Sequence, residues 1–205
     1  LNAQWLKAGL ESEETKKFAV SVLNHMREKL IGYQMEYGNL YGLEATPAES
    51  ATFRFARLDR ERFSGIRTAG HEGDAPYYTN STKLPADYDG TLQGALINQD
   101  SLQPLYTTGT VFHVYMEREL EDWKKARDLL SSMITEHHIP CFTLSPVYTI
   151  CQTCGYLPGR QERCPKCNGA ADVYSRIAGY YRPVHDWNDG KAQEFRNRIM
   201  FRIGE

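Results

Sequence analysis

Apolar residues recur every three or four positions near the beginning of the chain, and this spacing predicts an amphipathic helix over residues 12–37. Ser12 suits the N-cap of that helix, and Gly38 is a typical residue just past a helix end. We expect the apolar face of this helix to pack in the core. It holds Phe18, Val22, Met26, Leu30 and Tyr33.

Three further helices are predicted from the same kind of spacing. One lies near residues 90–103, a second covers residues 118–137, and the last begins near Gly190 and ends at about Met200. The second of these is strongly charged, and its apolar side chains fall on one face. They are Leu120, Trp123, Ala126, Leu129, Leu130 and Met133.

Strand-like segments lie between these helices. Apolar and polar residues alternate over residues 51–58, which predicts a strand. Residues 110–116 are rich in β-branched and aromatic residues, and residues 141–150 have the pattern of a buried strand. Because strands and helices alternate along the chain, we predict an α/β fold.

Composition and charge narrow the class of protein. The chain has 205 residues with 24 basic and 26 acidic side chains, a net charge of −2, which argues against nucleic-acid binding driven by overall charge. No apolar run approaches the roughly 18 residues of a membrane-spanning helix. The chain begins with Leu1 and carries no secretory signal, so we expect a piece of a longer cytoplasmic protein.

Four of the five cysteines form two CxxC pairs, Cys151 with Cys154 and Cys164 with Cys167. Two such pairs can close a tetrahedron of thiolates around one Zn²⁺ with no open ligand position, which indicates a structural site. Iron–sulfur ligation and a redox dithiol are the alternatives. Many zinc ribbons bind nucleic acid, but this segment offers few aromatic side chains on which bases could stack.

Gly179 lies between β-prone residues just after the cysteine segment. Its local pattern fits a turn or bulge glycine. Glycine is also the residue that best holds a backbone carbon radical, because without Cβ the α-carbon can flatten and share the unpaired electron with the flanking amides. Such a radical must be shielded from water and oxygen, so we expect a buried loop tip.

The sequence around Gly179 resembles a known family. Residues 176–180, Arg-Ile-Ala-Gly-Tyr, resemble the C-terminal signature of glycyl radical enzymes. The tail through residues 187–191 and the upstream cysteines look like those of anaerobic (class III) ribonucleoside-triphosphate reductases. Residues 43–50, 76–85 and 106–113 resemble further family blocks in the same order, although Thr108 stands where the family often has a second glycine.

This resemblance implies a mechanism and partners. A radical S-adenosylmethionine activase with an iron–sulfur cluster would form the glycyl radical on Gly179. The radical would then generate a thiyl radical that reduces a ribonucleoside triphosphate to the deoxyribonucleotide, with formate or a thiol as the reductant. The thiyl cysteine would lie in an N-terminal portion, because this chain has no cysteine before Cys141. The full enzyme would be a homodimer, and this chain alone would be inactive.

The resemblance also implies a fold and a division of the chain. Residues 1–150 would form the C-terminal part of a ten-stranded α/β barrel, residues 151–168 the zinc site, and residues 169–205 the radical loop and terminal helix. Two polar stretches are candidates for contacts to the substrate phosphates, although each also fits an ordinary turn. They are Asn80, Ser81 and Thr82, and Thr108, Gly109 and Thr110.

Two other functions remain open at this point. The chain could be a separately expressed glycyl radical module that docks onto a damaged or split enzyme, or a non-enzymatic zinc-ribbon interaction domain. Among the remaining candidate residues, we expect His113 to be a hydrogen-bonded core histidine, and Cys141 to be a small buried side chain.

Overall fold

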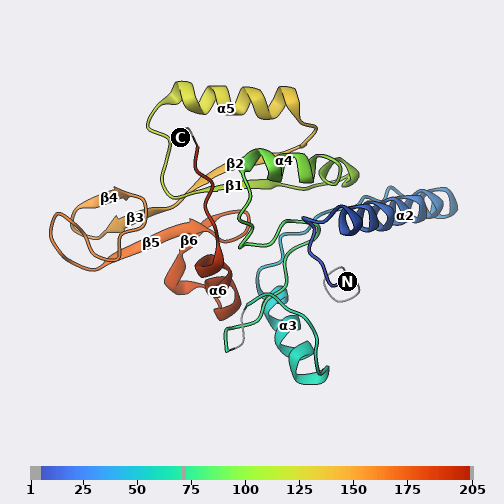
Figure 1. Ribbon diagram of the computed structural model, residues 1–205, viewed down its shortest axis with the longest axis horizontal. Coiled ribbons are helices and arrows are strands. Elements are labelled where there is room, and N and C mark those ends of the chain that lie inside the picture. Colours follow the sequence, from blue (N-terminus) through green and yellow to red (C-terminus); the bar gives the residue numbers. More distant parts are fainter. Residues whose placement is uncertain (1–5, 71–72, 204–205) are drawn as a thin grey trace.

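The computed structural model describes residues 6–70 and 73–203, and Figure 1 shows the arrangement of its elements. Helices and strands alternate through the middle of the chain, from α4 (Leu92–Asp100) through β1 (Phe112–Met116) and α5 (Trp123–Glu136) to β2 (Phe142–Pro146). The 3₁₀ turn η1 (Gln103–Leu105) follows α4. The predicted α/β class is therefore confirmed, whereas a ten-stranded barrel stays a prediction for the complete protein.

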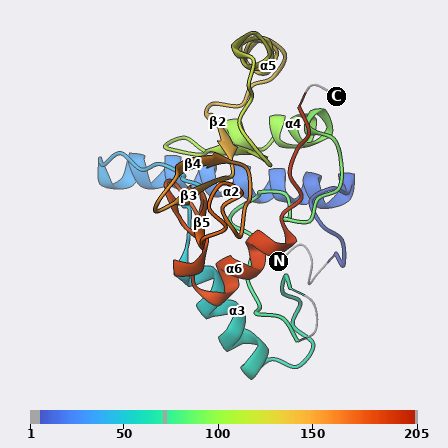
Figure 2. The same cartoon turned by 90° about the vertical axis from the view of Figure 1, so that its left-hand side faces the viewer.

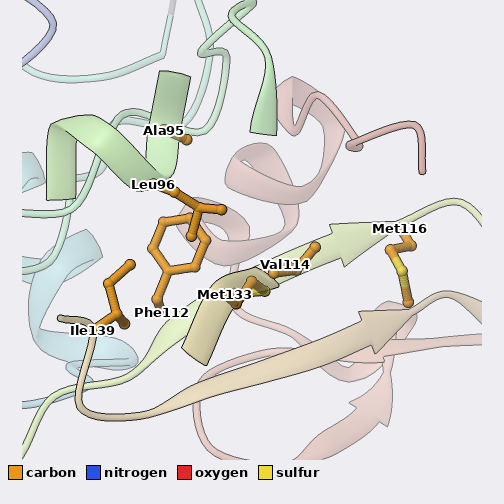
Figure 3. Close-up of a cluster of buried hydrophobic side chains, with 7 residues drawn as sticks. All are labelled: Ala95, Leu96, Phe112, Val114, Met116, Met133 and Ile139. Atoms are coloured by element: carbon orange, nitrogen blue, oxygen red, sulfur yellow. The ribbon is translucent and has the colours of Figure 1, made fainter. Parts of the chain in front are cut away.

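The central unit is the parallel pair of β1 and β2, in which Phe112 lies opposite Phe142. A parallel connection needs a crossover, and α5 provides it. Alternate residues of β1 are buried, and side chains from α4, α5 and β1 converge on one core cluster (Figure 3). Its buried members are Ala95, Leu96, Phe112, Val114, Met116, Met133 and Ile139.

A second, antiparallel sheet follows in the order β4-β3-β5-β6. Its strands are β3 (Tyr148–Cys151), β4 (Gly155–Pro158), β5 (Ala171–Arg176) and β6 (Tyr181–Pro183). The single strand predicted over residues 141–150 is thus two strands in two sheets. The chain changes sheets after Val147, whose N–H still donates to the Met116 carbonyl of β1 at 3.0 Å, and Tyr148 begins β3.

The first predicted helix is present as α2 (Glu13–Tyr37), with Ser12 as its N-cap and Gly38 in the left-handed conformation at its C-cap. The predicted core face is confirmed at Leu30, which packs against the cluster around Leu102, and is wrong at Met26 and Tyr33. The buried residues are Thr15, Ala19 and Leu23, whereas Met26 and Tyr33 are exposed. Small Ala19 allows α2 to approach the cluster around Leu102. The C-terminal end of the helix projects away from the other elements (Figure 1).

The strand predicted over residues 51–58 is wrong, because the structure has the helix α3 (Ser50–Arg62) there. Its buried residues Thr52 and Ala56 are four apart, which is helical spacing, and Phe55 points outward at 56% exposure. The alternation of apolar and polar residues was therefore coincidental. α3 packs beside the last helix, α6 (Asp189–Asn197), as the turned view shows (Figure 2).

The three later helices are confirmed with shorter bounds than expected. Thr91, Asp122 and Asn188 accept the first amide hydrogen bonds of α4, α5 and α6. Trp123 does not join the core face of α5 and is 67% exposed under the guanidinium of Arg127. None of the helices within the described residues combines the length and apolar character that crossing a membrane requires.

Candidate metal centre and glycine hairpin

The four predicted metal-binding cysteines come together at one end of the antiparallel sheet. Cys151 ends β3 and Cys154 lies in the turn to β4, while Cys164 and Cys167 lie in the loop between β4 and β5. Their sulfur atoms all lie within 4.8 Å of one another. Residues with positive φ close both loops, Gly155 after the first pair and Asn168 after the second.

The spacing of the sulfurs fits a single metal ion. Cys151 Sγ and Cys167 Sγ are 3.6 Å apart, too far for a disulfide bond. Zinc–sulfur bonds of about 2.3 Å in a regular tetrahedron would place the sulfurs about 3.8 Å apart. An iron–sulfur cluster binds its cysteines through different iron atoms and would hold the sulfurs farther apart. The cluster therefore could bind a metal ion such as zinc.

One thiol of the cluster is already biased toward the thiolate form that a metal requires. Burial alone would raise the pKa of Cys164, but the backbone amides of Cys167 and Lys166 donate to its sulfur and lower the pKa to about 6. A side-chain hydrogen bond with Cys167 raises the pKa of Cys154 to about 12. Without a metal ion, hydrogen bonds among the sulfurs favour the thiolate form at Cys164 and the thiol form at Cys154. A divalent cation at the centre would favour the thiolate form of all four cysteines.

Gly179 lies in the turn of the hairpin that joins β5 to β6. Arg176 pairs with Tyr181 at the end of the ladder, and Ile177 N–H donates to the Tyr180 carbonyl at 3.1 Å inside the turn. The predicted loop tip is therefore present, but it is not buried. Gly179 and Tyr180 are exposed, although the Tyr180 hydroxyl donates to Glu49 at 3.1 Å.

Arg176 holds the glycine turn in place. Its Nη1 donates to the Gly179 carbonyl at 2.7 Å, and its Nε donates to Ser145 Oγ on β2 at 3.0 Å. Its guanidinium also lies 4.9 Å from the centre of the Tyr181 ring. The carbonyl of an exposed turn glycine is thus tied to the central parallel pair by a charge-assisted hydrogen bond.

A single strand connects the cysteine cluster to the glycine hairpin. β5 pairs with β3 at Ala171, which lies opposite Cys151, and its other end at Arg176 leads into the turn of Gly179. Six residues of strand span about 20 Å. The metal ligands and the glycine therefore lie at opposite ends of the same rigid element.

The six predicted substrate-binding residues form two adjacent stretches. Thr82 Oγ1 and the hydroxyl of Tyr106, which precedes the second stretch, are 3.0 Å apart. Gln99 also links the two stretches. Its Nε2 donates to the Thr82 carbonyl at 2.9 Å, and its Oε1 accepts from Gln103 Nε2 at 2.6 Å. Thr110 Oγ1 in turn donates to Gln103 Oε1. The structure thus joins the two stretches through a buried amide network.

Most other polar groups of these stretches have internal partners. Asn80 Nδ2 donates to the Ala48 carbonyl at 2.9 Å, and the Gly109 carbonyl accepts from Ala45 N–H at 2.8 Å. Ser81 has a positive φ of 51°, and Thr108 is exposed. A structural role accounts for the contacts seen here, and binding of substrate phosphates stays a prediction.

A buried ion cluster beside the hairpin was missed in the sequence. Glu194 of α6 pairs with Lys191 at 2.6 Å and with Arg198 at 2.9 Å, and both basic side chains are almost completely buried. Burial alone would raise the pKa of Glu194, but Lys191 and Arg198 outweigh it and lower that pKa. The spacing of these residues, three and four apart on one helix face, is the signal that could have revealed the cluster.

Replacing Glu194 with glutamine is expected to destabilise the protein by about 3–5 kcal/mol at pH 7, because Lys191 and Arg198 are buried and lose the carboxylate with which both pair. A lowered carboxyl pKa stabilises the fold above the unfolded pKa of about 4.3, and this contribution is lost as the pH falls through the folded pKa. The difference between variant and native protein should therefore shrink below about pH 4.

Urea unfolding at pH 7 and at about pH 3 measures this difference. Glu121→Gln serves as the control, since Glu121 is 80% exposed and its 3.7 Å pair with Arg118 lies at the surface. A loss of stability no larger than that of the control would show that the ion cluster does not stabilise the fold.

The prediction for His113 is confirmed, whereas the prediction for Cys141 is wrong. His113 Nδ1 lies 2.8 Å from Thr143 Oγ1, which agrees with a hydrogen-bonded histidine. Burial and then the positive charges of Lys83 and Arg176 lower the pKa of His113 to about 3, so the ring is neutral at pH 7. Cys141, predicted as buried, is exposed, because it precedes β2 at the end of the loop from α5 rather than lying within the strand.

Comparison with known proteins gives consistent matches over almost the whole chain. The family model described as anaerobic ribonucleoside-triphosphate reductase matches residues 3–201. The anaerobic ribonucleoside-triphosphate reductase of Haemophilus influenzae is 24% identical over 97% of this chain, and that of Enterobacteria phage T4 is 25% identical over 87%. The chain spans only 29% and 30% of their respective lengths.

Solved structures agree in fold. A structure named anaerobic ribonucleotide reductase superimposes with a TM-score of 0.74 at 22% identity, over 93% of this chain and 29% of that protein. The anaerobic ribonucleotide reductase from Thermotoga maritima, solved with MES in its active site, gives a TM-score of 0.70 at 23% identity, over 86% of this chain and 28% of its own.

Proposed function

Because the chain belongs to the anaerobic ribonucleoside-triphosphate reductase family, we propose that it supplies the C-terminal, radical-bearing part of such an enzyme. In this proposal Gly179 carries a glycyl radical and Cys151, Cys154, Cys164 and Cys167 hold a structural Zn²⁺. The thiyl cysteine and the remaining strands of the barrel come from the rest of the protein. The complete enzyme reduces ribonucleoside triphosphates to deoxyribonucleoside triphosphates.

The observation that supports this role best is the setting of Gly179. The residue occupies the turn of a hairpin, where an activase can reach its α-carbon, and Arg176 donates to its carbonyl at 2.7 Å. A radical at the α-carbon spreads its unpaired electron into that carbonyl. A cationic hydrogen-bond donor on the oxygen favours this delocalisation and holds the turn in one conformation.

The reaction divides between this chain and the rest of the protein. The activase removes one hydrogen atom from the α-carbon of Gly179, leaving the unpaired electron there. Gly179 regains a hydrogen atom from a cysteine thiol in the remainder of the enzyme, and the resulting thiyl radical takes the 3′-hydrogen of the ribose. Water leaves C2′, formate or a thiol supplies the two electrons of the reduction, and the cysteine thiol returns a hydrogen atom to C3′, which restores the thiyl radical.

The metal site has a mechanical role in this proposal. A closed Cys₄ site with Zn²⁺ supplies no reactive position and acts as a cross-link at the far end of β5. Cys151 and Ala171 are opposite one another, so fixing the cysteines fixes the strand that leads to Gly179. We therefore assign the zinc to positioning of the radical hairpin. The substrate would lie near the amide network of Thr82 and Thr110.

Anaerobic activation followed by exposure to oxygen tests this function. The complete protein, incubated with its activase and S-adenosylmethionine, should give a doublet in electron paramagnetic resonance, because a glycyl α-carbon keeps one hydrogen. Air should then cut the backbone at Gly179, and mass spectrometry of the fragments should place the cut between residues 178 and 180. Cutting at Gly169 or Gly190 instead would show that another glycine carries the radical.

A further inference from the structure

Four tyrosines, one from each strand, form a cluster on one face of the antiparallel sheet. Tyr148 of β3 lies opposite Tyr174 of β5, and their rings stack with centroids 5.3 Å apart and an interplanar angle of 4°. The rings of Tyr156 and Tyr181 have centroids 5.7 and 5.2 Å from that of Tyr148. These four residues are called the tyrosine cluster below.

The two faces of this sheet differ in what covers them. Neighbouring residues of a strand point to opposite faces, and Val173, next to Tyr174, packs against a core cluster that includes Phe195 of α6. On the tyrosine face, Tyr156 is 45% exposed and the other three rings are half-buried. The hydroxyls of Tyr148 and Tyr174 make no hydrogen bond within the described residues. They can therefore donate to a partner.

The tyrosine cluster continues directly to the turn of Gly179. Tyr181 follows Gly179 by two residues, and the guanidinium that donates to the Gly179 carbonyl, that of Arg176, lies 4.9 Å from the centre of the Tyr181 ring. Two steps of 5.2 and 5.7 Å, through Tyr148, connect the rings of Tyr181 and Tyr156, which are thus at most about 11 Å apart. The exposed turn and the tyrosine face form one continuous surface.

A protein that takes a hydrogen atom from Gly179 needs more contact area than the turn provides. A specific protein interface covers about 800 Å² on each partner, which corresponds to a disc of about 16 Å radius. The exposed residues of the turn are Gly179 and Tyr180, so neighbouring surface has to supply most of that area. Because α6 covers the other face of the sheet, the tyrosine face is the surface at hand. Tyrosine is also enriched among the residues that dominate binding energy at interfaces.

We propose that the tyrosine cluster is the docking surface for the activase, the protein that removes the hydrogen atom from Gly179. This inference rests on the proposed function, because a partner needs to reach Gly179 only if that residue carries the radical. The matching surface of the activase would be flat and largely apolar, with hydrogen-bond acceptors that face the hydroxyls of Tyr148 and Tyr174.

Binding of the activase to the complete protein, measured by biolayer interferometry without S-adenosylmethionine, tests the surface without forming a radical. Tyr156→Ala should raise the dissociation constant about tenfold or more, because it removes an exposed aromatic ring from the contact. Tyr156→Phe should retain most of the affinity. With excess activase and S-adenosylmethionine, Tyr156→Ala should still give the doublet, because its defect is in docking.

Tyr33→Ala is the matched control. Tyr33 is also 45% exposed and also lies beside other tyrosines, with ring centroids 6.1 Å from Tyr37 and 6.3 Å from Tyr41, but it belongs to α2. Its loss should leave the affinity for the activase unchanged.

Hydrogen exchange of the complete native protein gives a second readout that requires no substitution. β4 is an edge strand of its sheet, so its outward amides have no partner in the sheet and should exchange quickly. The activase should slow exchange in β4 and leave exchange in α2 unchanged.

Either of two results would overturn the docking surface. One is that Tyr156→Ala binds the activase as tightly as the native protein and Tyr33→Ala. The other is that exchange in β4 is already slow without the activase and does not change with it, as would occur if another part of the complete protein covers this face. A radical that forms at Gly179 alongside either result leaves the proposed function in place and removes the docking surface alone.

Discussion

Gly179→Ala is expected to abolish both the radical signal and all turnover of the activated enzyme. A methyl group on the α-carbon crowds the planar geometry that a backbone radical needs and removes one of the two hydrogens from which the radical forms. The structure indicates that the protein can otherwise accept this change. A Cβ built at Gly179 meets no atom within 4 Å, and the φ of Gly179 lies outside the left-handed region.

The fold of the variant should therefore be unchanged, with a stability within about 1 kcal/mol of the native protein. Electron paramagnetic resonance after anaerobic activation, a turnover assay and zinc analysis on the same sample measure the three properties together. Gly32→Ala in α2 is the matched control, because a Cβ there also meets nothing within 4 Å. A doublet that persists in Gly179→Ala would show that the radical lies elsewhere.

We expect the native protein to carry about one zinc ion per chain and Cys164→Ser to lose most of it. Cys164 is the most buried ligand of the cluster at 1% exposure, and its sulfur accepts the backbone amides that form the second CxxC turn. Binding of structural zinc is worth about 10–16 kcal/mol in small domains, and it falls steeply when one thiolate is lost. Without the ion, β5 loses its anchor, and radical formation at Gly179 should fail.

The loss should stay local to the antiparallel sheet. The core cluster between β1, α4 and α5 contains no cysteine, so its amides should keep their protection from hydrogen exchange. Cys141→Ser provides the control, because Cys141 is exposed and lies outside the cluster. Metal analysis decides the question: full zinc retention in Cys164→Ser would contradict the assignment of this residue as a ligand.

The sequence predicted correctly those features that depend on interactions between neighbouring residues. Two CxxC pairs place four sulfurs together because each pair fits one tight turn, and Ser12 and Gly38 mark the ends of α2 because capping depends on neighbouring residues. The turn at Gly179 follows equally from its place between two β-prone runs.

Features that depend on distant partners could not be predicted. The buried face of α2 is set by Leu102 and its neighbours, far along the chain, rather than by the largest apolar side chains of the helix. The alternation in residues 51–58 gave no indication that this segment is a helix that packs beside α6. Lys83 and Lys191 line one cavity only because two segments about a hundred residues apart meet there.

Glu49, just before α3, connects the hairpin to a part of the chain that is distant in sequence. Its carboxylate accepts from the hydroxyl of Tyr180, 131 residues further along the chain, and lies 3.6 Å from Arg182. Contacts across so long a loop form slowly, because the chain loses conformational entropy in closing the loop before the contact can stabilise it. The turn of Gly179 itself is held by local contacts, from Ile177 N–H to the Tyr180 carbonyl, so only the docking of the hairpin beside α3 depends on this long-range closure.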